Sequence, residues 1–166
     1  FIDPDNVAQA GVDGIGLYRT ELPYMTSATF PDRDAQAALY AGVLRQLPGK
    51  RVIFRTFDIG GDKKVPYLQA GEEENPAMGW RATRIGLDRP GILRTQFAAL
   101  IAAGAGQPLD VMLPFIAQVS EFDAAKKLFD AELALARVKS SAVLDDMLLD
   151  ISSILWQIEE LMWRVD

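Results

Sequence analysis

Arg51-Val52-Ile53-Phe54-Arg55-Thr56 has the composition of a short strand buried in a parallel α/β protein, because its centre is apolar and β-branched. The run ends in an aromatic residue followed by Arg and Thr, and Gly14-Ile15-Gly16-Leu17-Tyr18-Arg19-Thr20 ends in the same way. About one strand–helix–strand unit separates the two runs. We therefore predict that both arginines lie at the same edge of a parallel sheet, where such folds bind ligands.

Predicted strands and helices alternate along most of the chain. The apolar runs that predict strands cover 14–20, 51–57 and 109–115. The periodic segments that predict helices cover 4–10, 32–47, 90–103 and 120–138. This alternation predicts one α/β domain over residues 1–166, built on a parallel sheet.

The composition excludes several kinds of chemistry within this chain. It contains no histidine and no cysteine, so a histidine base, a phosphohistidine or a thiolate metal site is impossible in it. The formal net charge of −6 argues against a nucleic-acid binder, although focused arginines can still attract an anion. No run is apolar for the length of a membrane span and no signal segment is recognisable, so we expect a cytoplasmic protein without a membrane anchor.

Arg19 and Arg55 are the candidate ligands for an anion. Two guanidinium groups at one sheet edge can hold a phosphate or a carboxylate through paired hydrogen bonds. The loop that follows Arg55 adds Gly60 and Gly61, which let backbone N–H groups turn toward an anion, and the positive charge of Lys63. An ordinary glycine turn is the alternative interpretation of the pair. The aspartates of this loop, Asp58 and Asp62, are candidates either for orienting the arginines or for binding a metal-bound water.

Four motifs resemble one enzyme family. They are Gly-Ile-Gly-Leu-Tyr-Arg-Thr-Glu (14–21), Phe-Arg-Thr-Phe-Asp-Ile-Gly-Gly-Asp-Lys (54–63), Glu-Asn-Pro-Ala-Met-Gly-Trp-Arg-Ala-Thr-Arg (74–84) and Met-Leu-Pro-Phe-Ile (112–116). In this order they resemble Enzyme I, the phosphoenolpyruvate–protein phosphotransferase of the bacterial sugar transport system, in its carboxyl-terminal, phosphoenolpyruvate-binding domain. Residues 21–25 are more similar to the nitrogen-related branch of the family.

The resemblance implies a TIM (β/α)8 barrel. A complete barrel takes about 250 residues, so this chain is expected to be a partial one with about three to four parallel strands and flanking helices. Residues 1–138 resemble the family closely, whereas residues 139–166 are divergent or replaced.

The resemblance also implies roles for individual residues. Arg19 and Arg55 are expected to bind the phosphate of phosphoenolpyruvate, and Arg81 is expected in the same cleft. A family Mg²⁺ ligand, a glutamate, aligns with Asp150, which is one methylene shorter. The second metal ligand, the arginine for the substrate carboxylate, the proton-donating cysteine and the phosphohistidine domain are all expected outside this chain.

Residues 140–165 have apolar side chains at three- and four-residue steps, which predicts one long amphipathic helix. A divergent family strand followed by a helix is the alternative. In the helical case Asp150 loses its metal-binding role. Trp156 and Trp163 share a face away from the main stripe, and either pack on a neighbouring element or contact another subunit.

Two functions are compatible with these observations. The first is a fragment of a phosphotransferase that binds phosphoenolpyruvate but has no turnover alone, since nothing in this chain can replace the missing histidine. The second is a non-catalytic or engineered partial-barrel scaffold. An open barrel exposes sheet edges, and pairing between chains would cover them, so we expect a homo-oligomer.

Overall fold

The computed structural model describes residues 11–22, 25, 27, 29–60, 65, 79–139 and 146–149. Within them, four parallel strands form one sheet in the order β1-β2-β3-β4. The strands are β1 (Gly14–Arg19), β2 (Arg51–Arg55), β3 (Asp110–Leu113) and β4 (Asp146–Leu149). The predicted parallel sheet and the three predicted strand positions are confirmed.

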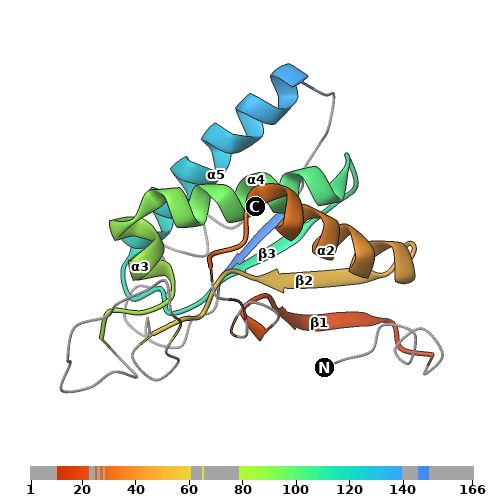
Figure 1. Cartoon of the computed structure of the whole chain (residues 1–166), viewed down its shortest axis with the longest axis horizontal. Helices are drawn as coiled ribbons and strands as arrows, with labels where there is room; N and C mark the ends of the chain where they lie inside the picture. The colour runs from red at the N-terminus through yellow and green to blue at the C-terminus, as the bar shows by residue number, and fades with distance from the viewer. Residues whose placement is uncertain are drawn as a thin grey trace.

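Helices cover one side of this sheet. They are α2 (Arg33–Gln46), α3 (Thr83–Asp88), α4 (Pro90–Gly104) and α5 (Val119–Lys139). Figure 1 shows α2, α4 and α5 on the same side of the strands, and α4 packs between α2 and α5. Strands in chain order with their helices on one side are consistent with part of a (β/α)8 barrel, whereas a doubly wound sheet has helices on both sides.

Local sequence sets where the helices begin. The Asp32 side chain accepts a hydrogen bond from the Ala35 N–H at 2.8 Å and caps α2. Pro90 occupies the first turn of α4, where a missing N–H costs nothing. Glu121 accepts hydrogen bonds from the N–H groups of Ala117 and Gln118 before α5. The three long predicted helices are thus confirmed, whereas the short helix predicted over 4–10 lies outside the described residues.

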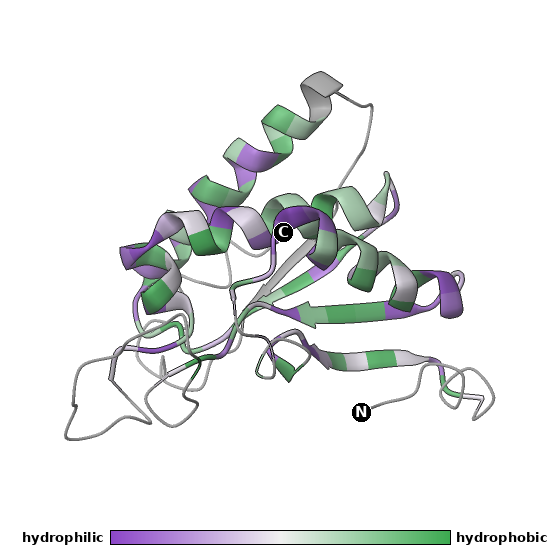
Figure 2. Ribbon diagram, in the orientation of Figure 1, coloured by the Kyte–Doolittle hydropathy of each residue, from purple (hydrophilic) through white to green (hydrophobic). Residues whose placement is uncertain are grey.

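The hydrophobic core lies between the helices and the sheet. The aromatic rings of Tyr40 and Phe54, from α2 and β2, are 5.4 Å apart, and those of Phe97 and Phe129, from α4 and α5, are 5.2 Å apart. In Figure 2 strand β2 is apolar over most of its length, whereas α5 alternates polar and apolar residues. Such a pattern is expected of a strand that lies beneath amphipathic helices. No helix in the described residues is long and apolar enough to cross a membrane.

The prediction of one helix over 140–165 is wrong at Asp146–Leu149, which form β4 and pair with β3. Three consecutive apolar residues satisfy a helix pattern and a buried strand equally well. The strand is favoured here because pairing with residues 146–149 satisfies the backbone N–H and C=O groups at the edge of β3. The rest of 140–165, including Trp156 and Trp163, lies outside the described residues.

Candidate anion site

Arg19 and Arg55 lie side by side at the carboxyl ends of adjacent strands. The two residues are register partners in the parallel pairing of β1 with β2. Neighbouring strands are about 4.8 Å apart, and register partners in a parallel pair project to the same face. The backbone therefore places Arg19 beside Arg55, as the repeated tripeptide predicted.

A β-bulge in β1 produces this alignment. Ile15 pairs with Val52 and Tyr18 pairs with Phe54, so β1 contains one residue more than β2 between these two pairs. In a regular strand Arg19 would share the face of Ile15, which is buried in the core beneath the helices. The additional residue moves Arg19 to the opposite face, as bulges often do beside functional sites. Sequence reasoning missed the bulge, although a glycine at position 16 inside a strand can indicate one.

Four charged side chains, Glu21, Arg55, Asp58 and Arg81, form a buried group that we call the charge cluster. None of them is more than 8% exposed. Arg55 Nη2 contacts Glu21 Oε1 and lies 3.1 Å from Asp58 Oδ2, and Arg81 Nη2 lies 2.7 Å from Asp58 Oδ1. Asp58 thus bridges both arginines, and the two negative charges compensate the two positive ones.

The charge cluster joins the ends of three strands. Glu21 follows β1, Asp58 follows β2, and the Arg81 guanidinium lies 4.2 Å from the ring centroid of Phe115, which follows β3. Phe115 has a φ of 58°, a left-handed conformation that costs a non-glycine residue about 1–2 kcal/mol. This turn presents the ring to Arg81, where a cation–π contact contributes about 1 kcal/mol.

The three predicted arginines therefore differ in burial and in ion pairing. Arg55 and Arg81 are buried and held by carboxylates. Arg19 is exposed and has no ion-pair partner within the described part of the chain. Asp58 contacts Arg55, as expected from the sequence, and also Arg81, whereas Asp62 lies outside the described residues. Glu21 was missed, because nothing in its position along the chain indicates that it contacts a strand 34 residues away.

Of the predicted phosphate-loop residues and the predicted metal ligand, only Gly60 lies within the described part of the chain. Gly60 is buried, whereas Gly61, Lys63 and Asp150 lie outside the described residues. Among the described side chains, no group of three or more carboxylates is arranged to hold a metal ion. The carboxylates nearest to the site, Glu21 and Asp58, already contact arginines. These two carboxylates are thus engaged by arginines, and the predicted Mg²⁺ ligand Asp150 is not among the described side chains.

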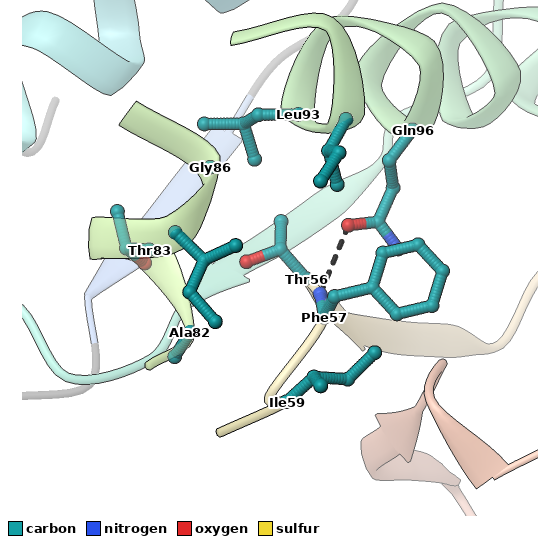
Figure 3. Close-up of a pocket in the computed structure, with 10 residues that line it drawn as sticks. Thr56, Phe57, Ile59, Ala82, Thr83, Gly86, Leu93 and Gln96 are labelled. Carbon is teal, nitrogen blue, oxygen red and sulfur yellow. Dashed lines mark hydrogen bonds between the residues drawn. The ribbon is translucent and has the colours of Figure 1, made fainter. Parts of the chain in front are cut away.

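A small cavity lies between the end of β2 and helices α3 and α4 (Figure 3). The space open to the centre of a water molecule is about 10 Å³, which is close to the room that one water needs. The cavity is lined by Thr56, Phe57, Ile59, Ala82, Thr83, Ile85, Gly86, Ile92, Leu93 and Gln96. None of these side chains is charged, so the cavity is not the anion site.

Tyr18 precedes Arg19, and its burial raises the pKa of the phenol. An unfolded tyrosine has a pKa of about 10. As the pH rises, the unfolded chain therefore loses the phenol proton at a lower pH than the folded chain. The resulting stabilisation is complete below about pH 10 and is lost as the pH rises through the folded pKa. We expect the unfolding free energy of the parent chain to fall more steeply above pH 10 than that of Tyr18→Phe. Urea unfolding from pH 8 to 11.5 measures this, and parallel curves would contradict it.

Known proteins match the chain over nearly its whole length. A family model described as "PEP-utilising enzyme, PEP-binding domain" matches residues 3–166. The chain belongs to this family. The resemblance seen in the four motifs is thus confirmed.

Several curated relatives of the PEP-utilising family share nearly half of their aligned residues with this chain. Phosphoenolpyruvate-protein phosphotransferase of Latilactobacillus sakei is 48% identical over 145 residues, which cover 87% of this chain and 25% of that protein. The protein of the same name from Staphylococcus carnosus is 44% identical over 149 residues, covering 90% of this chain and 26% of that protein. The chain therefore spans about a quarter of the length of these relatives.

Proposed function

We propose that this chain forms part of the phosphoenolpyruvate-binding site of a phosphoenolpyruvate–protein phosphotransferase. The observation that supports this best is the register pairing of Arg19 with Arg55 at the ends of β1 and β2. The relatives carry that name, and their alignments cover 87% and 90% of this chain. Residues that bind a phosphoryl group act by positioning it and by stabilising its charge.

The two arginines have different tasks in this proposal. Arg55 is a fixed donor, because the charge cluster holds its guanidinium in place before any ligand arrives. Such preorganisation lowers the cost of binding. Arg19 is exposed and closes on the phosphate from the neighbouring strand. Its charge also adds one positive unit to a cluster that is otherwise balanced, which favours an anion at this edge.

The isolated chain binds but does not transfer. Phosphoryl transfer in the proposed parent needs a histidine acceptor, and this chain contains no histidine. A separate phosphohistidine domain is the proposed acceptor. When bound, Mg²⁺ would neutralise charge on the phosphate, and Asp150 remains only a predicted ligand for it. A cytoplasmic location, the nitrogen-related branch and a homo-oligomer also remain proposals.

Arg19→Ala is expected to weaken phosphoenolpyruvate binding by about tenfold or more, the equivalent of one lost charge-assisted contact of about 1.5–3 kcal/mol. Calorimetric titration of the chain with phosphoenolpyruvate, with and without Mg²⁺, measures the change. Arg33→Ala is the matched control, because Arg33 is also exposed and contacts only the exposed Asp34 among the ion pairs of the described residues.

Equal affinities for Arg19→Ala and Arg33→Ala would contradict the assignment of Arg19. A parent chain that gives no heat with phosphoenolpyruvate would contradict the proposed site as a whole. If that chain were also a dimer by light scattering, the alternative of a non-catalytic scaffold would be supported instead.

A further inference from the structure

Gln96 of α4 is a fully buried amide on the helix side of the sheet. Its Oε1 accepts a hydrogen bond from the Phe57 N–H at 2.9 Å, which Figure 3 marks with a dashed line. Its Nε2 donates to Thr20 Oγ1 at 2.9 Å and to the Tyr40 hydroxyl at 3.1 Å. The Gln96 side chain thus accepts one hydrogen bond through its oxygen and donates two through its nitrogen, all to buried groups.

These bonds lead directly to the backbone of Arg55. The Thr20 hydroxyl, which accepts from Gln96, donates to the Arg55 carbonyl at 2.8 Å. The Thr56 N–H between these groups donates to the Met112 carbonyl of β3 at 2.9 Å. The peptide groups of residues 55–57 are therefore held by Thr20, which follows β1, by β3 and by helix α4.

We propose that Gln96 is a positioning residue for Arg55, fixing the backbone from which the guanidinium extends toward its anion. This inference rests on the proposed function of Arg55. A glutamate at position 96 would lack the two donors, and an aliphatic residue would lack the acceptor as well. Gln96 touches no ligand in this proposal and acts only through the end of β2.

The chain contains a matched control for Gln96. Gln36 of α2 is also fully buried, and it joins the same network at its far end. Gln36 accepts from the Tyr40 hydroxyl at 3.2 Å and donates to the Pro31 carbonyl at 2.9 Å. Neither of these two bonds involves β2. Gln→Met at either position removes a buried amide of the same size, so a general loss of core hydrogen bonds affects both variants.

The experiment compares Gln96→Met with Gln36→Met in the same chain. Phosphoenolpyruvate affinity is measured by calorimetry, and the Arg55 Nε–Hε signal and the hydrogen exchange of the Phe57 amide are measured by NMR. We expect Gln96→Met to weaken binding by about tenfold, since small errors in placement carry large penalties. We also expect it to shift the Arg55 signal and to accelerate Phe57 exchange, whereas Gln36→Met, which bonds Tyr40 and Pro31 but not β2, changes all three less.

The outcomes separate failure of the positioning role of Gln96 from failure of the proposed function. If the parent binds and Arg19→Ala weakens binding, but the two Gln variants behave alike, the positioning role is overturned and the proposed function stands. If the parent binds nothing, the proposed function fails, and the Arg55 signal and Phe57 exchange still decide whether Gln96 fixes this strand end. If Gln96→Met does not fold, Thr20→Val and Thr20→Ser replace it. Only Thr20→Ser, which keeps the hydroxyl, should restore the parent values, and identical values for both Thr20 variants would overturn the inference.

Discussion

Replacing Asp58 with Asn is expected to lower the free energy of unfolding by about 3–5 kcal/mol, the usual cost of breaking a buried ion pair. Asp58 lies 2.7 Å from Arg81 Nη2 and 3.1 Å from Arg55 Nη2. Asn has nearly the same shape, so the change removes a charge without leaving a cavity. It removes the charge that faces Arg81 Nη2 and one of the two carboxylates that contact Arg55 Nη2, the other being Glu21. Urea unfolding followed by circular dichroism measures the loss.

Asp130→Asn is the control for Asp58→Asn. Asp130 Oδ2 lies 2.9 Å from Lys126 Nζ one turn earlier in α5, and both side chains are exposed. An exposed helical pair of this kind contributes about 0.3–0.5 kcal/mol. A similarly small loss for Asp58→Asn would show that the charge cluster is well solvated or readily rearranged, and would contradict its role as a fixed support for Arg55.

The second large effect is expected at Gly14, the first residue of β1. A Cβ at this position would overlap the carbonyl oxygen of Arg51, which belongs to the backbone of the paired strand. A flexible side chain could move away, but a paired backbone cannot move without breaking the sheet. We expect Gly14→Ala to destabilise the chain by about 2–3 kcal/mol or more, at the upper end of overpacking effects. Thermal and urea unfolding both measure it.

Gly16→Ala tests the same substitution two positions later. Nothing lies within 4 Å of a Cβ built on Gly16, and its backbone does not need a left-handed conformation. Its stability is expected to stay within about 0.5–1 kcal/mol of the parent value. Equal losses at the two glycines would mean that β1 is not paired with β2 as described.

Local sequence predicted most of the elements because their signals are local. Pro90 and Asp32 mark helix starts, and the run that contains Val52 and Phe54 is short, apolar and β-branched. The placement of Arg19 beside Arg55 also followed from a repeated tripeptide and from the general topology of parallel sheets. These inferences need no knowledge of which distant side chains touch.

The features that the sequence did not predict all depend on distant contacts. Glu21 and Gln96 are polar residues in unremarkable positions, and they become specific only when folding places them against β2. The pairing of β4 with β3 is a third such feature, because Asp146 becomes the register partner of Asp110 only in the folded sheet.

The bulge in β1 means that the spacing along the chain is as much a part of the proposed binding motif as the residues themselves. Removing one residue between Ile15 and Tyr18 would keep every letter of the Tyr-Arg-Thr signature, yet Arg19 would turn into the apolar interior. A protein engineer who grafts this signature onto another barrel must therefore transfer the odd spacing too. A search for homologous sites that scores letters alone will accept strands whose arginine points the wrong way.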